Sequence, residues 1–328
     1  KEEMHIDGFR FDLAAILSRD KNGQPLSDPP TLLAIDSDYT LAETKIFAEA
    51  WDASGLYQVG RMAGARWREW NGHFRDDVRS FVKGDRGMVP RLASRLTGSP
   101  DIYQAPFADP HKSLNFVTCH DGFTLWDLVS YDHKHNLDNG EDNRDGSDAN
   151  YSWNHGVEGP TDDPQIRALR LRQAKNLMTI NLISVGTPMM LMGDEVLRSQ
   201  QGNNNAYCQD NPISWMNWQS TPEGDEMYRF MRELVSYRLI RQDSMAELIS
   251  LGEALEHARI VWHGVHPFAP ARGDDSRSIG LTAYSLGHKA DYYAFFNAYW
   301  EPLEVELPPP PHNPNGTWLR LVDTSLPA

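Results

Sequence analysis

Hydrophobic positions along the chain follow two patterns, which change at about residue 241. Before this point, short strand-like apolar runs alternate with stretches of helical spacing, as is typical of an α/β fold with parallel strands. After it, the apolar runs are short, β-rich and separated by Gly, Pro and charged turns. The pattern predicts an α/β domain over residues 1–241, either a barrel or an open sheet, and an all-β sandwich over residues 242–328.

Three short apolar segments of the first domain carry a carboxylate at or near their end. They are Asp7–Asp12, Lys45–Trp51, which contains Glu49, and Leu114–Asp121. In a parallel barrel the carboxyl ends of all strands open onto one face. We therefore expect Asp12, Glu49 and Asp121 to point into one pocket, although they lie far apart in the sequence.

Apolar spacing also predicts the helices. The clearest helix begins after Asp163, which can cap the first turn before Pro164, and is expected to end at about Ser184. Two more are expected over residues 225–241 and 76–82. The positions expected to face the core are Ile166, Leu169, Leu177 and Ile180 in the first helix, and Met227, Phe230, Met231, Leu234 and Leu239 in the second.

The remaining segments are assigned by composition. Residues 51–71, rich in Trp, Arg and Gly, are expected to form loops and helical segments. The apolar run 188–192 predicts another barrel strand. The four prolines at 308–311 predict a stiff connector between two strands of the sandwich, with a recognition motif for proline-binding modules as the alternative.

The bulk properties exclude several classes of partner. The formal net charge of -15 and the pI of about 5.2 argue against nucleic acid, because no basic stripe is present to displace its counterions. The sequence has no apolar run near the roughly 20 residues of a membrane span, and its first residues lack a signal peptide pattern. Only Cys119 and Cys208 are present, which favours reduced thiols in a cytoplasm.

Two of the three acids suit the retaining cleavage of a glycosidic bond. This reaction needs a carboxylate nucleophile and a protonated carboxylic acid about 5 to 5.5 Å away. Arg10 lies two residues before Asp12, so on a strand it faces the same side and would hold Asp12 ionised. Trp51 lies two residues after Glu49, and an apolar wall there would raise the pKa of Glu49, as an acid catalyst requires.

Simpler interpretations exist for the same residues. Arg10 and Asp12 taken alone are explained by a structural ion pair, and His120 alone by a histidine buried in the core. Three acids at three apolar strand ends favour catalysis instead. In that case His120, next to Asp121, is able to donate a hydrogen bond to a sugar hydroxyl.

Several segments resemble a known family. Residues 7–14, 47–52 and 116–121 are similar to regions shared by the α-amylase superfamily of glycoside hydrolases, family 13. Residues 136–153, 156–163 and 202–211 are similar to its isoamylase and glycogen debranching branch. The resemblance covers residues 4–241 closely and the remainder loosely.

The resemblance implies a fold and roles for the site residues. The fold is a (β/α)8 TIM barrel followed by the β-sandwich, with barrel strands four to eight present and the N-terminal part missing, so little activity is expected from the chain alone. Asp12 is implied as nucleophile, Glu49 as general acid/base and Asp121 as the acid that grips the distorted sugar ring. Arg10, His120 and Trp51 are expected to contact the substrate.

The implied reaction is hydrolysis of α-1,6-glucosidic branch linkages in glycogen or limit dextrins, without an organic cofactor. An α-1,4-acting or trehalose-releasing relative, or a non-catalytic glucan-binding subunit, are the alternatives. The acidic run 138–150 has calcium-like spacing but carries Ser152 where a closing Glu is needed, so calcium is a minor option. The sequence shows no Cys or His cluster with zinc spacing.

Overall fold

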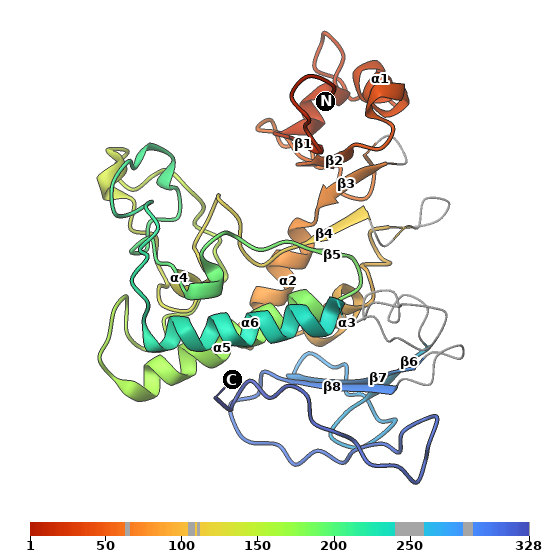
Figure 1. Cartoon of the computed structure of the whole chain (residues 1–328), viewed down its shortest axis with the longest axis vertical. Helices are drawn as coiled ribbons and strands as arrows, with labels where there is room; N and C mark the ends of the chain where they lie inside the picture. The colour runs from red at the N-terminus through yellow and green to blue at the C-terminus, as the bar shows by residue number, and fades with distance from the viewer. Residues whose placement is uncertain (63–65, 104–108, 110–111, 240–258, 285–290, 328) are drawn as a thin grey trace.

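The fold is built around a five-stranded parallel sheet. The computed structural model describes residues 1–62, 66–103, 109, 112–239, 259–284 and 291–327. Five strands lie side by side in sequence order, each parallel to the next, and they descend from the N-terminus in Figure 1. This arrangement confirms the predicted α/β fold with a parallel sheet. The first and last of the five strands form the edges of the sheet.

The strands and helices have the following bounds. The parallel strands are β1 (Gly8–Phe11), β2 (Lys45–Ala48), β3 (Trp67–Trp70), β4 (Ser113–Asn115) and β5 (Thr187–Pro188). The α-helices are α1 (Pro30–Ser37), α2 (Gly72–Lys83), α3 (Val89–Leu96), α4 (Leu125–Leu128), α5 (Pro164–Ile183) and α6 (Pro222–Leu239). Short 3-10 helices cover Ala14–Ser18, Tyr39–Leu41, Leu137–Asn139, Asp194–Val196 and Ala206–Cys208.

Two helices begin at side chains that cap their first turn. The Asp163 carboxylate accepts a hydrogen bond from the Gln165 amide at 2.8 Å, and Pro164 follows as the first residue of α5, as predicted. Asn71 caps α2 in the same way, accepting a hydrogen bond from the Phe74 amide at 3.0 Å.

Asn71 lies at the end of residues 51–71, a segment that was expected to form loops and helical segments and no strand. The prediction is wrong there, because β3 occupies the end of that segment and Asn71 follows it directly.

The largest buried cluster is formed mainly by the helices, and the buried residues of the parallel strands belong to two smaller clusters. Helices α5 and α6 run side by side in Figure 1, and α5 also contacts α2. On α5, Leu177 and Ile180 are buried as predicted, but Leu169 is 37% exposed. On α6 the first four predicted positions are buried, whereas Leu239 is exposed. The spacing therefore identifies the correct face over most of each helix but not its full extent.

The fifth strand differs from its prediction. Only Thr187 and Pro188 form β5; the Met189 amide still donates to Asn115 O at 2.7 Å, but the run to residue 192 forms no strand. Met192 has a side chain that is 82% exposed, so the run 188–192 is not a buried barrel strand. Apolar composition alone cannot distinguish a strand from an apolar segment that leaves the sheet, because no pairing partner is visible in the sequence.

The C-terminal part contains a second, antiparallel sheet. Its strands β6 (Arg259–His263), β7 (Ser278–Tyr284) and β8 (Asp291–Asn297) pair in sequence order, and they lie below α5 and α6 in Figure 1. The β7 residues Ile279 and Leu281 belong to the same buried cluster as the helices. The β-rich character of this part was predicted, but its described strands form one sheet, and the second layer of a sandwich stays a prediction.

Two further predictions concern this part. The boundary at residues 241 and 242 lies outside the described residues. The prolines at 308–311 follow β8, and no strand comes after them in residues 291–327, so they do not connect two strands there. Pro308 instead accepts a hydrogen bond from the Trp318 indole at 2.6 Å, and Trp318 packs against Tyr293 of β8.

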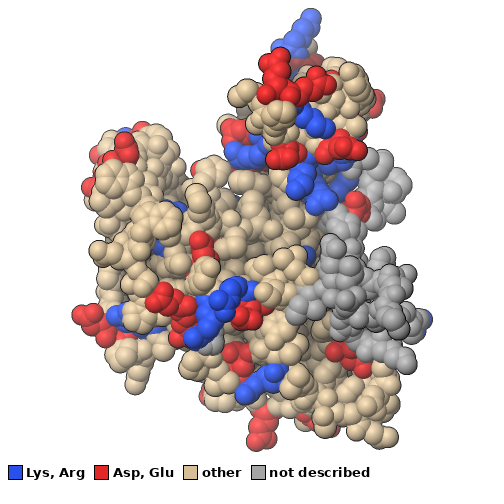
Figure 2. Space-filling model, viewed as in Figure 1, with Lys and Arg blue, Asp and Glu red and all other residues tan. Residues whose placement is uncertain are grey.

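The surface shows charges of both signs. In Figure 2, acidic and basic side chains intermingle around the N-terminal end of the molecule instead of forming a patch of one sign. None of the helices in the described part of the chain combines the length and the apolar character that a membrane crossing requires. Both cysteines are free, Cys119 buried and Cys208 exposed.

Leu177 and Leu169, two of the leucines of α5, provide a test of the packing. We expect Leu177→Ala to lower the free energy of unfolding by about 2 to 5 kcal/mol, because it opens a cavity at a side chain that is 2% exposed. Leu169→Ala on the same helix should cost about 0.5 kcal/mol or less. Urea unfolding followed by circular dichroism measures both. Equal losses in the two variants would contradict the assigned face.

Candidate active site

Arg10 joins two of the predicted catalytic acids. Strands β1 and β2 pair in parallel, and Glu49, just past β2, donates its amide to Phe11 O at 3.1 Å. This register places the residues after both strands next to each other. One nitrogen of the Arg10 guanidinium lies 3.0 Å from Asp12 Oδ1, and the other lies 2.8 Å from Glu49 Oε1. A single positive charge therefore contacts both carboxylates.

The two acids have different surroundings. Glu49 is 3% exposed, whereas the Asp12 side chain is 71% exposed. Burial raises the pKa of Glu49, because a charged carboxylate loses its hydration there. The Leu13 amide, which donates to Glu49 Oε2 at 2.8 Å, and the Arg10 charge lower this pKa without cancelling the effect of burial. Glu49 is thus the acid that holds a proton more readily than usual.

The third acid, Asp121, affects the pKa of Glu49. The negative charges of Asp12 and Asp121 both raise the pKa of Glu49, because each favours its protonated form. His120 Nε2 lies 3.4 Å from Asp121 Oδ1, and both side chains are exposed. The structure thus brings together Arg10, Asp12 and Glu49 by direct contact, with His120 and Asp121 beside them.

Asp121 does not end a strand, contrary to the prediction. Strand β4 ends at Asn115, and Asp121 lies in the loop that follows. A buried carboxylate holds both ends of this loop, since Asp194 accepts hydrogen bonds from Thr118 Oγ1 and from the Leu125 amide. The Gly122 amide also donates to Asn204 O at 2.9 Å. Loop contacts, rather than strand pairing, position His120 and Asp121.

Trp51 packs against a tyrosine of the following segment. It lies beyond β2, in an isolated bridge with Tyr57, and the two rings stack at 5.9 Å. The structure shows burial as the main cause of the raised pKa of Glu49. A contribution from Trp51 to that pKa, or to substrate binding, stays a prediction.

Sequence reasoning missed Trp70, at the end of β3. The Arg10 guanidinium carbon lies 4.5 Å from the centre of the Trp70 ring, and the His120 ring lies 5.8 Å away, edge to face. The signal available was the segment Trp67–Trp70, bounded by aromatic residues, directly before Asn71 and Gly72, which are typical of a helix start. Because β3 ends in a tryptophan, the pattern of acids at strand ends does not include it.

The acidic loop 138–150 holds its residues in a polar network. Asp145 accepts hydrogen bonds from the side-chain amides of Asn139 at 2.7 Å and Asn205 at 2.9 Å. Asn143 Oδ1 accepts from the Asn136 amide at 2.7 Å. Across the described ranges, His, Cys, Asp and Glu form no group of three or more that could hold a metal ion.

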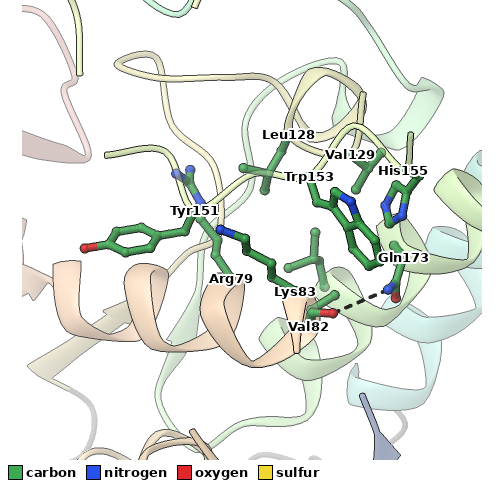
Figure 3. Close-up of a pocket in the computed structure, with 10 residues that line it drawn as sticks. Arg79, Val82, Lys83, Leu128, Val129, Tyr151, Trp153, His155 and Gln173 are labelled. Carbon is green, nitrogen blue, oxygen red and sulfur yellow. Dashed lines mark hydrogen bonds between the residues drawn. The ribbon is translucent and has the colours of Figure 1, made fainter. Parts of the chain in front are cut away.

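A small depression lies away from the acids, between α2 and α5. Figure 3 shows Tyr151, Trp153 and Lys83 around it, with Gln173 donating to Val82 O at 3.4 Å. Its interior volume of about 20 Å³ fits a water molecule but not a sugar ring. His155 also lines it, and burial lowers the pKa of this histidine to about 4. The depression is too small to be a glucan site.

The chain is similar in sequence to two groups of known proteins. The chain is 44% identical over 331 residues to "Isoamylase 3, chloroplastic" of Oryza sativa subsp. japonica, which covers 99% of this chain and 40% of the rice protein. It is 48% identical over 228 residues to "Glycogen debranching enzyme" of Serratia proteamaculans, covering 69% of this chain and 34% of that protein. The chain is homologous to isoamylases and glycogen debranching enzymes.

A solved structure agrees at the level of the fold. Pullulanase from Bacillus acidopullulyticus superposes with a TM-score of 0.61 at 18% identity, covering 90% of this chain and 32% of that one. No family model matches the chain. The chain spans less than half the length of these two curated relatives. Its alignment to the rice isoamylase covers nearly all of its own residues.

The contact between Arg10 and Glu49 can be tested by titration. We expect Arg10→Met to raise the pKa of Glu49 further, because the variant removes the positive charge that favours the ionised form. Glu49 would then lose its proton at a higher pH than in the unsubstituted protein. Carbon-13 NMR of the glutamate carboxyl groups measures this.

Arg19→Met is the matched control. Arg19 pairs with Asp52 at 2.6 Å and does not contact Glu49, so its removal should leave the titration of Glu49 unchanged. An unchanged or lower Glu49 pKa in Arg10→Met would contradict the assigned contact.

Proposed function

We propose that the chain carries the catalytic acids of a debranching glycoside hydrolase, which cleaves α-1,6-glucosidic branch linkages in glycogen or limit dextrins with retention. The observation that carries this proposal is the pair Asp12 and Glu49, which share Arg10 but differ in exposure. Homology to isoamylases and glycogen debranching enzymes supports the substrate class. The proposal concerns the whole protein, since the chain spans 40% of the rice relative.

In this proposal Glu49 is the acid and Asp12 the nucleophile. A buried carboxyl group that keeps its proton can give it to the leaving glycosidic oxygen, and an exposed carboxylate can attack the anomeric carbon. This forms a glycosyl–Asp12 ester. Glu49, now ionised, then removes a proton from the water that cleaves the ester. Both carboxyl groups return to their starting states.

Arg10, His120 and Asp121 bind and orient in this scheme. Arg10 keeps Asp12 and Glu49 on the two nitrogens of one planar group, which fixes their relative positions. Asp121 accepts hydrogen bonds from sugar hydroxyls, and His120 donates one. Both are exposed in the structure, so a sugar ring can reach them without displacing the core.

The order of the sheet supports a barrel assignment. The five parallel strands follow one another in space as in sequence, and helices follow β1, β3, β4 and β5 along the chain. We assign them to positions four to eight of a (β/α)8 barrel spanning residues 1–241, with a sandwich domain over 242–328. A cytoplasmic location stays part of the proposal; it rests on the two free thiols, while the rice relative is described as chloroplastic.

Substitution of the two acids tests the function. We expect Asp12→Asn and Glu49→Gln each to lower kcat/KM on a glycogen limit dextrin by at least about 100-fold, because each removes a group that forms or protonates a bond. Asp7→Asn, at the opposite end of β1, should have no effect, since Asp7 is exposed and lies at the far end of the strand. Reducing-end release measures the rates.

The products separate the alternatives. Release of linear chains as long as the branches, without shorter sugars, supports debranching. A ladder of short maltooligosaccharides would assign the α-1,4 reaction, and free trehalose the trehalose-releasing reaction. Glycogen binding without turnover in the unsubstituted protein would support the non-catalytic alternative. Full activity of Asp12→Asn would refute the assigned nucleophile.

A further inference from the structure

Trp70 occupies a central place in the site without being an acid or a base. It is the last residue of β3 and lies opposite Leu114 of β4 in the sheet. Its side chain is 7% exposed and packs against Phe116, with ring centres 5.5 Å apart. The indole is therefore held by the sheet and by a buried neighbour, and it has little freedom to move.

The rigid indole lies against two residues of the site. Arg10 stacks over it, with 4.5 Å between the guanidinium carbon and the ring centre. The edge of the same guanidinium carries the nitrogens that contact Asp12 and Glu49. The face and the edge of Arg10 are thus both occupied. His120 meets the Trp70 ring edge to face at 5.8 Å, next to Asp121.

We propose that Trp70 is a positioning residue for the hydrolysis, a fixed platform that holds the Arg10 guanidinium between Asp12 and Glu49 and places His120 beside Asp121. The inference rests on the proposed function, because it assigns Trp70 a role toward those acids. Trp70 acts through Arg10 and His120.

The physical reason is the freedom of the Arg10 side chain. An arginine on an exposed site has several rotatable bonds, and the solvated carboxylate of Asp12 is able to follow it into other positions. Glu49 is buried and cannot follow. A cation over an aromatic face is attracted by the ring electrons, and tryptophan provides the strongest such attraction. Trp70 therefore favours the one orientation in which Arg10 reaches both acids.

Trp67 of the same strand offers a matched comparison. It is fully buried, but it lies three residues earlier and so faces the other side of the sheet. Its ring packs against Phe11 at 4.9 Å and belongs to a different buried cluster from Trp70. Substituting Trp67 changes an aromatic residue of β3 without touching Arg10.

The first experiment is a titration of Glu49 by carbon-13 NMR. Arg10 and Asp12 face Glu49 from β1, Asp121 faces it from the loop after β4, and the Leu13 amide donates to it. Trp70→Leu should raise the Glu49 pKa, because Arg10 spends less time at Glu49. Trp70→Phe should restore most of the original value, since it keeps an aromatic face. Trp67→Phe should leave the pKa unchanged.

The second experiment is a double-mutant cycle on limit-dextrin hydrolysis with Arg10→Lys. Trp70→Leu alone should lower kcat/KM about tenfold, the size expected for losing a cation over an aromatic ring. In the Arg10→Lys background the same change should cost clearly less, because lysine cannot present the planar group that Trp70 supports. Urea unfolding of every variant shows which are folded.

The outcomes decide between positioning and packing alone. Additive losses, with an unchanged Glu49 titration in both Trp70 variants, would overturn the proposal, and Trp70→Phe provides this test if Trp70→Leu does not fold. The proposed function fails separately: an active Asp12→Asn variant refutes the catalytic assignment, whereas the dependence of the Glu49 pKa on Trp70 is measured without substrate.

Discussion

The contact of one guanidinium with two carboxylates is the interaction on which the site depends. Burying a carboxylate such as Glu49 is costly unless a positive charge or hydrogen-bond donors compensate for the lost hydration. Arg10 and the Leu13 amide provide this compensation, and the net effect still leaves the Glu49 pKa raised. Asp12 contacts the same guanidinium from an exposed position. The two acids therefore share one positive charge but differ in their exposure to solvent.

Buried carboxylates elsewhere shape the loops that complete the site. Asp194 accepts hydrogen bonds from both ends of the loop that carries His120 and Asp121. Asp127 accepts hydrogen bonds from Ser199 Oγ at 2.6 Å and from the Gln200 amide, which fixes the segment after the short helix Asp194–Val196. Burial raises the pKa of both aspartates to about 6. Loops with few regular pairings thus keep a defined course at the carboxyl edge of the sheet.

Much of the fold follows from local pattern. The cap and length of α5, the approximate position of α6, the strands around residues 8–11 and 45–48 and the β character of the C-terminal part were predicted, because helical and strand periods depend on neighbouring residues. The errors occur where distant contacts decide. Leu169 continues the apolar stripe of α5 but is 37% exposed, and residues 189–192 continue an apolar run without forming a strand.

The sequence by itself determined which residues could carry the chemistry: three acids near strand ends, with an arginine and a histidine beside them. The residue types and the two-residue period of a strand are enough for this, since they place Arg10 and Asp12 on the same side of the chain. The tertiary structure decided which acid is buried, that Arg10 reaches Glu49 as well as Asp12, and that Trp70 lies beneath it. Burial and contact depend on neighbours brought together by the sheet register from segments far apart in the chain, and no local pattern contains that information.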